Sequence, residues 1–556
     1  MQSPSILGIY CVSNGFEHDH SVCLMKDKHI VKYYPLERLS QVKYDNQLLE
    51  KQHLVFNEDC ITKKDFTDST IAFTDSFTDF DINIQDIHVI GDKPSNNSPI
   101  KRQIIALSSE INKNIQVFSQ EICHVFSNIP FYGSFPDKTL GIHIDGGASY
   151  SNRSAWFIHD HGERLEYLGS DWDLHDDVNN FSTNHLTQII LGIFGRRGAD
   201  LVAPGRLMGL AGYGTYSADL QDWLERHQWF KDTTPRQFLK ACQADYRITP
   251  DITNPMDPFL ANIARVLQDN LTEKVLAYVQ KLKDQTQASV LAYAGGVALN
   301  IVTNSRIIRE LGFREVRIPP CCNDTGIAIG ACAVAAFNDT KRGEDTNFPK
   351  HSPFLCNSDL DDELGPSEDE VPRLARFLAD DQVIGVATGK GEAGPRALGH
   401  RSILANPSTR RMWQRVSIEI KHREPYRPLA PIVLEDVASQ IFEDVPSTGP
   451  VEFMLCDFRI RPTWLDAIPA VTHVDQTARA QIIKDHPTWG DAGELKFISS
   501  LLRILWEDYN IPCLINTSFN AAGQPIVHSR ADARAFAESM GLNQLVLGSQ
   551  IIHLKS

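Results

Sequence analysis

The sequence predicts an α/β protein that is built from at least two domains. Its 556 residues are more than one ordinary hydrophobic core accommodates. Hydrophobic residues make up 42% of the chain, and strand-like runs alternate with amphipathic helical segments. A polar, acidic and proline-broken stretch at residues 337–371 predicts a linker. We therefore expect one domain over residues 1–336 and a second over residues 372–556.

The composition argues against several classes of protein. A formal net charge of -16 disfavours general binding to nucleic acid or to a membrane surface. No apolar run reaches the roughly 18 residues that a membrane span requires, and the start MQSPSILGIYCV resembles a buried strand rather than a signal peptide. The 11 cysteines form no CxxC pair, which argues against structural zinc. Scattered cysteines fit a reducing compartment, so we expect a cytoplasmic protein.

The first predicted element is a hairpin that occurs twice. LGI at 7–9 is followed at Ser21 by SVCLMKD, and LGI at 140–142 is followed with the same spacing at Ser154 by SAWFIHD. Each copy has the pattern of a strand, a polar turn, a second strand and a third extended stretch. Chance likeness between two hairpins is one explanation. Duplication of a domain is the other, and it predicts the actin-like ATPase fold, which holds nucleotide phosphates between its two hairpins.

The elements that follow alternate between helix and strand. Residues 257–282 carry apolar side chains at a spacing of three to four, which predicts an amphipathic helix. Residues 289–311 have the pattern of a strand, a Gly-Gly turn and a helix. Residues 318–337 predict a loop that leads into a helix of small residues. Beyond the linker, residues 373–392 begin a second α/β unit.

A glycine-rich loop in the second unit gathers positive charge. The stretch GKGEAGPRALGHRSILANP holds Lys390, Arg396, His400 and Arg401 against one acid, Glu392. Glycines let backbone N–H groups approach an anion, and arginine offers paired donors that match phosphate or carboxylate. The stretch is not a Walker A loop, because no GKS or GKT closes a GxxxxG frame. A structural turn whose arginines pair with surface acids is the alternative.

Two later stretches favour the binding interpretation. IKHREPYRPLAP adds Lys421, Arg423 and Arg427, and IPAVTHVDQTARAQ adds His473 and Arg479. If these stretches fold together, several cations share one pocket, and burying them without a polyanion would be costly. ATP together with a small phosphorylated co-substrate would suit such a pocket.

These stretches, with others along the chain, match a known family. The chain resembles the O-carbamoyltransferases of the NodU and the tobramycin- or cephamycin-carbamoylating type, essentially from end to end. The most specific combination is GPRALGHRSIL with REPYRPLAP and NTSFN. Further matching motifs are HDHSVCL, LERLSQVKYD, IDGGAS, PGRLMGLAGYG, AYAGGVALN, NDTGIAIGA and FMLCD.

The resemblance implies a fold and a reaction. The first domain is expected to be actin-like and to carry out carbamoyl transfer. The second is expected to be YrdC-like and to form carbamoyl-adenylate from ATP and carbamoyl phosphate. The carbamoyl group then passes to a hydroxyl of a small-molecule acceptor, such as a natural product, a sugar or a nucleoside. A divalent metal is the further implied cofactor, and a homodimer is the implied assembly.

The resemblance also implies roles for individual residues. The positions expected to bind carbamoyl-adenylate are Lys390, Arg396, Arg401, Ser402, Lys421, Arg423 and Arg427. The positions expected near nucleotide or acceptor are Gly295, Gly296, Asn300, Met454, His473, Arg479, Asn516, Ser518 and Asn520. His18 and Lys43 match residues near the acceptor. His18 is the natural proton acceptor for a hydroxyl nucleophile, with Asp19 as its rival.

The metal site is where the sequence departs from the family pattern of HxxxH and two aspartates. His124 matches the second histidine, and Asp145 and Asp324 match the aspartates, but Gln120 stands where the first histidine is expected. An amide oxygen is a weaker ligand than imidazole for iron, so the preference shifts toward magnesium or manganese. Glu121 is one position off and points about 100° round the helix. Alternatively, His124 only hydrogen-bonds phosphate or water.

Two other functions remain open from the sequence. A tRNA threonylcarbamoyl transferase would share the chemistry, but the chain shows no basic stripe for RNA, so we expect no nucleic-acid partner. A nucleotide-binding scaffold without catalysis is supported only by Gln120. The acceptor is not identified, and we expect the irregular regions 46–120 and 160–200 to contribute to its site.

Overall fold

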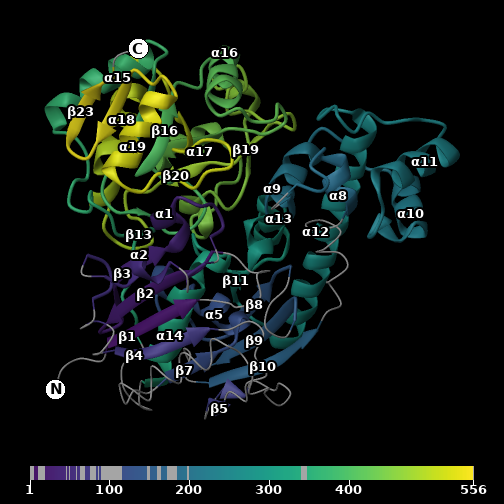
Figure 1. Ribbon diagram of the computed structural model, residues 1–556, viewed down its shortest axis with the longest axis horizontal. Coiled ribbons are helices and arrows are strands. Elements are labelled where there is room, and N and C mark those ends of the chain that lie inside the picture. Colours follow the sequence, from purple (N-terminus) through teal and green to yellow (C-terminus); the bar gives the residue numbers. More distant parts are fainter. Residues whose placement is uncertain are drawn as a thin grey trace.

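The computed structural model describes residues 5–10, 19–45, 47–48, 51–57, 59–62, 65, 69–74, 83–84, 87–88, 115–146, 151–159, 164–171, 185–196, 199–339 and 347–554. His18, the expected proton acceptor, lies outside these residues, as do most of residues 46–114. Figure 1 shows the C-terminal half lying above two N-terminal sheets, with a helical arm extending to the right.

The two N-terminal sheets repeat one strand order. The first contains β3 (His29–Pro35), β2 (Ser21–Lys26), β1 (Ser5–Tyr10), β4 (Ser69–Thr74) and β7 (Ile115–Phe118), in that order. The second contains β10 (Arg164–Asp171), β9 (Arg153–His159), β8 (Thr139–Ile144), β11 (Val290–Ala294) and β12 (Glu315–Arg317), in that order. In each sheet the first three strands in sequence form an antiparallel meander, and the last two are parallel to the first.

The two hairpins also pair in the same register. Gly8 lies opposite Cys23 in the first, and the equivalent Gly141 lies opposite Trp156 in the second. Equal strand order and equal register confirm the predicted duplication. The N-terminal half is therefore an α/β unit of the expected actin-like kind.

Two helices pack against each other between these sheets. α14 (Ile327–Asp339) carries the small residues noted in the sequence, and it contacts α5 (Gln120–Phe126) as well as β1 and β4. A Cβ atom added to Gly330 of α14 would lie 1.8 Å from the carbonyl oxygen of Cys123 in α5. The helices can approach this closely only because the residue is glycine. Their contact brings the start of α5 near the ends of β1 and β8.

Further helices build the arm and cover the N-terminal half. α12 confirms the amphipathic helix predicted over residues 257–282, and Asp257 caps it by accepting hydrogen bonds from two backbone N–H groups. The helices are α1 (Leu36–Ser40), α2 (Gln52–Val55), α6 (Ile129–Tyr132), α8 (His185–Ile190), α9 (Ala199–Ala211), α10 (Ala218–Arg226), α11 (Pro235–Asp245), α12 (Pro258–Thr286) and α13 (Ile301–Glu310).

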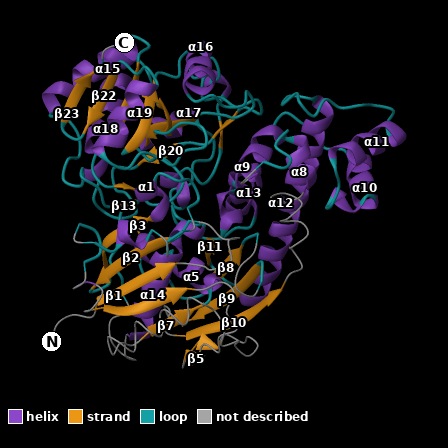
Figure 2. Ribbon diagram, viewed as in Figure 1, coloured by secondary structure: helices purple, strands orange, loops and turns teal. Residues whose placement is uncertain are grey.

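The C-terminal half is a mixed sheet with helices on its faces (Figure 2). The strand order is β20 (Gln481–Ile483), β17 (Ala430–Leu434), β21 (Leu514–Ser518), β16 (Arg401–Ala405), β14 (Val383–Ala387), β22 (Gln544–Leu547) and β23 (Gln550–His553). The helices are α15 (Val371–Ala379), α16 (Arg410–Trp413), α17 (Glu435–Ile441), α18 (Lys496–Tyr509) and α19 (Arg530–Ser539). A π-helix, η6 (Gln414–Ile420), continues α16.

The segment expected to be a linker contains a strand. β13 (Phe354–Cys356) pairs with β3 of the first sheet and with β15 (Gly391–Glu392) from the glycine-rich loop. Strands from downstream of the boundary thus extend the first N-terminal sheet. Among the described helices, none has both the length and the apolar character needed to cross a bilayer.

Candidate functional site

The glycine-rich loop lies where the two halves meet. It connects β14 to β16, and Nη2 of Arg38 in α1 donates a hydrogen bond to the carbonyl oxygen of Gly394, 3.3 Å away. A second link joins the same halves, because Nδ2 of Asn304 in α13 donates to the carbonyl oxygen of Leu455 at 2.8 Å. The loop is therefore held against the N-terminal half rather than exposed on the surface.

A group of positive side chains, the junction cations, collects at this boundary. One comes from the N-terminal half and five from the C-terminal half: Lys43, Arg396, Lys421, Arg423, Arg427 and Arg479. Burial is the largest cause that lowers the pKa of Arg423, and the neighbouring Arg427 adds to it, so that the pKa falls to about 9. Burial, followed by the proximity of Arg396, holds the pKa of Arg479 well below its ordinary value. The predicted convergence of cations is thus present.

Few acids face the junction cations. Arg427 lies 3.5 Å from a carboxylate oxygen of Glu424. The buried Nε atoms of Arg396 and Arg479 have no hydrogen-bond partner within the described part of the chain. Arginines that repel one another and lack acceptors are stabilised by a bound polyanion, since paired charges offset the loss of hydration. The arrangement can bind phosphate-rich ligands.

Lys421 contributes charge to this group, but its ammonium is already bound. It donates to the carbonyl oxygens of Ser518 and Asn520 and, at 2.6 Å, to Oδ1 of Asn520. Oγ of Ser518 donates to the same Oδ1 atom at 2.7 Å. These contacts give Lys421, Ser518 and Asn520 a role in shaping the turn after β21.

Arg401 is not among the junction cations. Its side chain is fully buried in β16 and donates to four backbone carbonyl oxygens and to Oγ of Ser358. Burial is the main cause that lowers its pKa to about 10. Ser402 is also buried, and its Oγ accepts a hydrogen bond from the N–H of Gly399 at 3.1 Å. Both side chains hold the loop in shape, and the ligand-binding role expected for them stays a prediction.

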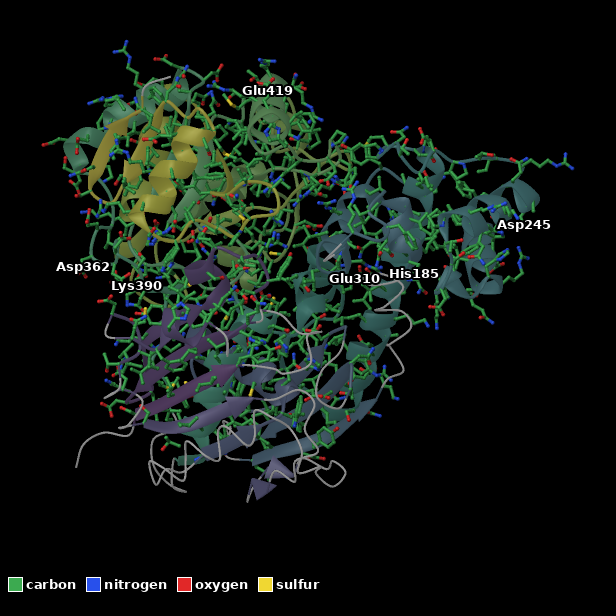
Figure 3. The ribbon with its side chains drawn as sticks, viewed as in Figure 1. His185, Asp245, Glu310, Asp362, Lys390 and Glu419 are labelled. Atoms are coloured by element: carbon green, nitrogen blue, oxygen red, sulfur yellow. The ribbon has the colours of Figure 1, made fainter. Side chains whose placement is uncertain are left out.

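Lys390 lies near His351 and Glu494. Burial is the main cause that shifts the pKa of each of these two residues, and the charge of Lys390 lowers both. Figure 3 shows Lys390 at the outer edge of the molecule. Its expected role in binding carbamoyl-adenylate stays a prediction.

The residues expected near nucleotide or acceptor divide into two sets. His473 is at the junction, with its ring 5.7 Å from that of Tyr213 and Nδ1 3.1 Å from Oδ1 of Asp475. Asn516 lies inside the sheet and donates to Gln481 at 2.8 Å. Met454 is buried in a left-handed backbone conformation just after a short 3₁₀ turn.

Asn300 and the Gly295–Gly296 turn lie in the N-terminal half. Oδ1 of Asn300 accepts the N–H of Thr303 at 3.1 Å, so this side chain caps α13. The N–H of Gly296 donates to Oδ2 of Asp145 at 2.5 Å. The glycine turn consequently borders the expected metal site.

Three charged residues form the N-terminal side of the junction. Asp19 is buried and accepts a hydrogen bond from Nδ2 of Asn323 at 3.1 Å. Glu37 was not expected from the sequence; burial and then the nearby Asp19 raise its pKa, and its Oε2 accepts the N–H of Tyr44. Burial lowers the pKa of Lys43, although Glu37 opposes the shift. The two carboxylates thus lie near Lys43, which in turn lies near Arg427 and Arg423.

The four expected metal residues lie together. Nε2 of His124 is 3.4 Å from Oδ1 of Asp324 and 3.7 Å from Oδ2 of Asp145. Nε2 of Gln120 donates to Oδ1 of Asp324 at 3.4 Å. Burial opposes protonation of His124, but Asp324 and Asp145 raise its pKa above the ordinary value. Glu121 instead accepts the N–H of Ser151 at 3.2 Å.

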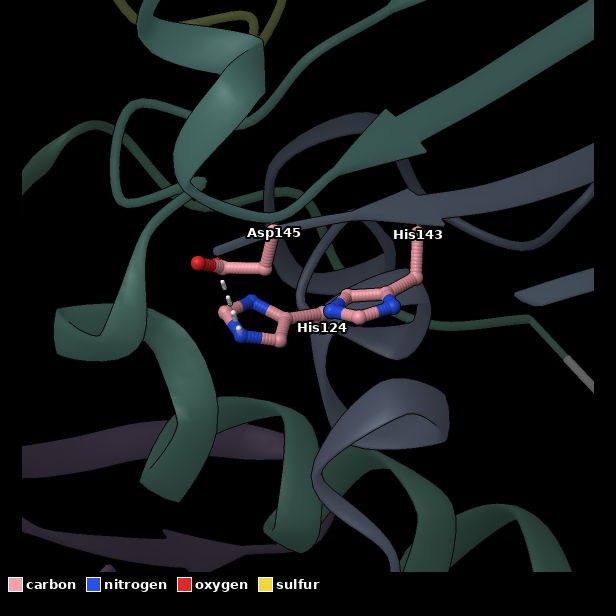
Figure 4. Close-up of side chains that lie close together, drawn as sticks. All are labelled: His124, His143 and Asp145. Atoms are coloured by element: carbon pink, nitrogen blue, oxygen red, sulfur yellow. Dashed lines mark ion pairs between the residues drawn. The ribbon is translucent and has the colours of Figure 1, made fainter. Parts of the chain in front are cut away.

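One further imidazole in this region was missed. His143 of β8 stacks on His124, with ring centroids 5.0 Å apart and planes inclined by 26° (Figure 4). Burial, followed by the proximity of His124, holds its pKa well below the ordinary value. The signal in the sequence was its position two residues before Asp145, because alternate residues of a strand share a face. Imidazoles beside carboxylates suit a divalent cation.

Comparison with known proteins identifies the family. Residues 88–333 match the family described as carbamoyltransferase N-terminus, and residues 375–554 match carbamoyltransferase C-terminus. This chain belongs to the carbamoyltransferase family. It is accordingly a transferase enzyme, as the motifs implied.

The relatives of this carbamoyltransferase include nodulation proteins. The nodulation protein NolNO of Sinorhizobium fredii is 26% identical over 576 residues, which cover 97% of this chain and 79% of that protein. The nodulation protein U of Azorhizobium caulinodans is 40% identical over 239 residues, covering 42% of this chain and 40% of that protein. An uncharacterised Methanocaldococcus jannaschii protein, MJ1058, is 29% identical over 468 residues, which cover 79% of this chain and 73% of that protein.

Proposed function

We propose that this carbamoyltransferase is an ATP-dependent O-carbamoyltransferase. Its C-terminal half acts as a YrdC-like domain that forms carbamoyl-adenylate from carbamoyl phosphate and ATP. Its actin-like N-terminal half then transfers the carbamoyl group to a hydroxyl of a small-molecule acceptor. The observation that carries the proposal is the set of junction cations, to which both halves contribute.

The charge of the substrates matches the charge of the junction. ATP and carbamoyl phosphate are both polyanions, and each releases a charged phosphate group during the reaction. Arg396, Arg423 and Arg479 are partly buried and repel one another, so a bound phosphate removes an unfavourable interaction as well as adding hydrogen bonds. Preorganised donors of this kind also stabilise charge that develops in a transition state.

The proposed chemistry has three balanced steps. Water converts carbamoyl phosphate to carbamate and phosphate. A carbamate oxygen then attacks the α-phosphorus of ATP, which forms carbamoyl-adenylate and releases pyrophosphate. Finally the acceptor hydroxyl attacks the carbamoyl carbon, its proton passes to a base, and AMP leaves. A closed passage between the halves limits loss of the adenylate to hydrolysis.

The N-terminal side of the junction would supply the base. Asp19 faces the cations from this side, together with Glu37 and Lys43. Asp19 can accept the proton of the hydroxyl, as can His18 beside it in the sequence. A divalent cation held near His124 would supply positive charge to nucleotide phosphate oxygens.

The deciding experiment is exchange of radiolabelled pyrophosphate into ATP. Metal-replete enzyme should catalyse exchange only when carbamoyl phosphate is present. Arg423→Ala should lower the exchange rate by about 100-fold or more, because it removes a donor to developing charge. Arg411→Ala is the matched control, since Arg411 is 70% exposed on α16 and pairs with Glu419; its exchange rate should stay within about twofold of wild type.

Either outcome is informative. Exchange that requires carbamoyl phosphate and is lost in Arg423→Ala would support adenylate formation, and mass-shift screening would then identify the acceptor. Absence of exchange in the wild-type enzyme would overturn the proposed first half-reaction. Nucleotide binding without turnover would then favour a scaffold role.

A further inference from the structure

Two buried imidazoles lie side by side with unsatisfied nitrogen atoms. His124 and His143 are both 0% exposed, and neither ring nitrogen of His143 has a hydrogen-bond partner among the described residues. Nδ1 of His124 is also without a hydrogen-bond partner there, while its Nε2 has ion pairs with Asp324 at 3.4 Å and with Asp145 at 3.7 Å. Buried polar atoms are nearly always satisfied, because leaving one unpaired costs about 1–3 kcal/mol. Neutral imidazole is the commonest metal ligand among side chains. A bound cation would satisfy one nitrogen of each ring.

The strand geometry directs His143 toward the same region as Asp145. His143 is in β8 and Asp145 follows the strand, so the two residues share one face of the sheet. α5, which carries His124, packs against that strand. Figure 4 shows the three side chains meeting from these two elements.

The distances suit coordination after small movements of side chains. One ligand atom from each of His124, His143 and Asp145 can be chosen so that all lie within 4.8 Å of one another. Ligands that each lie about 2.1 Å from a metal are separated by roughly 3–4 Å. Asp324 adjoins the group, because one of its oxygens is 3.4 Å from Nε2 of His124.

We propose that His143 supplies the imidazole that the Gln120 position does not, which gives His124, His143, Asp145 and Asp324 as the metal ligands. Two nitrogen and two oxygen ligands favour a transition metal such as Fe²⁺, Mn²⁺ or Co²⁺ over Mg²⁺. Loss of the helical histidine is thus compensated from the neighbouring strand.

Gln120 receives a different role in this proposal. Its Nε2 donates to Oδ1 of Asp324 at 3.4 Å, so it positions a ligand instead of coordinating the ion. Groups that orient ligands affect metal affinity less directly than the ligands themselves. Substitution of Gln120 and of His143 should therefore have clearly different consequences. The proposal concerns metal binding alone and does not depend on carbamoyl transfer.

The test is a Co²⁺ titration of full-length protein that has been stripped of metal with a chelator. Visible absorption reports coordination by nitrogen and oxygen, and mass spectrometry reports stoichiometry. Wild type should bind one Co²⁺ per chain. His143→Ala and His143→Asn should bind Co²⁺ more than about 100-fold more weakly, whereas Gln120→Ala, which loses only a group that orients a ligand, should bind about tenfold more weakly. His124→Ala serves as the positive control for loss of a ligand.

Thermal unfolding separates loss of a ligand from loss of the fold. Without metal, His143→Asn should unfold within a few degrees of wild type, because the ring nitrogens it removes are unpaired. Co²⁺ should raise the unfolding temperature of wild type and of Gln120→Ala, but not that of His143→Asn.

Two results would overturn the proposal. The first is unchanged Co²⁺ affinity and spectrum in both His143 variants together with loss of binding in Gln120→Ala. The second is absence of Co²⁺ binding to wild type. Because the titration uses neither ATP nor carbamoyl phosphate, both results are distinct from a failure of the pyrophosphate-exchange assay.

Discussion

Arg206 and Glu424 form an ion pair across the junction, with Nη1 of the arginine 2.8 Å from Oε1 of the glutamate. Arg206 belongs to α9 of the N-terminal half, and Glu424 belongs to the segment that carries the junction cations. The second oxygen of Glu424 lies 3.5 Å from Nη1 of Arg427. Glu424 therefore connects Arg427, a proposed phosphate-binding residue, to α9 of the N-terminal half.

Glu424→Gln should slow pyrophosphate exchange by about tenfold, because a small displacement of a positioning group is costly to catalysis. The free energy of unfolding should change by less than about 1 kcal/mol, since partly exposed ion pairs contribute little. Glu538→Gln is the control, because it removes an ion pair with Arg534 that lies within α19 and is more exposed. Exchange as fast as in the control would show that Glu424 does not position Arg427. Urea unfolding measures the change in the free energy of unfolding.

Arg401→Met should destabilise the fold severely. The guanidinium of Arg401 is buried and donates to carbonyl oxygens from several segments, which would be left without donors. We expect the free energy of unfolding to fall by about 3–5 kcal/mol, measured by urea unfolding or as loss of soluble protein. Arg423→Ala should cost less than about 1 kcal/mol, because it relieves repulsion among half-buried cations. Equal stability of the two variants would contradict this distinction.

Local patterns in the sequence were sufficient to predict much of the fold. The repeated hairpin rests on two similar stretches with the same internal spacing, and the helix over residues 257–282 rests on apolar residues three to four apart; both are confirmed. β13 was not predicted, because three apolar residues inside a polar stretch carry no usable period. It becomes a strand through pairing with β3 and with β15. Its formation depends on tertiary contact.

The site could be predicted in its chemistry but only partly in its geometry. Glycine and arginine in one loop indicated an anion site, and the junction cations agree with that interpretation. The sequence of the same loop gives no signal that the guanidinium of Arg401 is bound by backbone carbonyl oxygens while Nε of Arg396 has no partner among the described residues. His143 did carry a local signal, but its value depends on α5 covering that face of β8. The surroundings of Arg401, Arg396 and His143 thus depend on how the helices and strands pack together, which the local sequence does not show.

Gly212, which follows α9, sets how closely the halves approach. A Cβ atom there would lie 2.2 Å from Cε1 of His473. Gly212→Ala should therefore displace the ring from Tyr213 and lower the free energy of unfolding by about 1–3 kcal/mol. Pyrophosphate exchange should also become slower. Urea unfolding and the pyrophosphate assay check both effects.

Two variants isolate the cause of that effect. The double variant Gly212→Ala/His473→Ala should be more stable than Gly212→Ala, because the clash is removed. Gly205→Ala lies within α9, which precedes Gly212, and nothing is within 4 Å of its added Cβ atom. This variant should raise the free energy of unfolding by about 0.5–1 kcal/mol, because alanine is more stable than glycine in a helix interior. Absence of rescue in the double variant would rule out the clash with His473.

Asp475 should contribute stability that depends on pH. Burial acts to raise its pKa, but hydrogen bonds from His473 and Thr477 outweigh it and lower the pKa to about 2, from 3.8 in the unfolded chain. A depressed acid pKa stabilises the folded state at pH values above the unfolded pKa. That contribution should be lost as the pH falls from about 4 to about 2. Asp475→Asn removes it at every pH.

The measurement is the urea midpoint of wild type and Asp475→Asn between about pH 6 and about pH 2. The difference between them should be constant above about pH 5 and should shrink steadily below about pH 4. Other acidic groups titrate in both proteins, so the difference isolates Asp475. Thr477→Val removes the shorter hydrogen bond, 2.6 Å long, and should reduce the pH dependence partially. A difference that does not change with pH would show that Asp475 is not held in its charged form by His473 and Thr477.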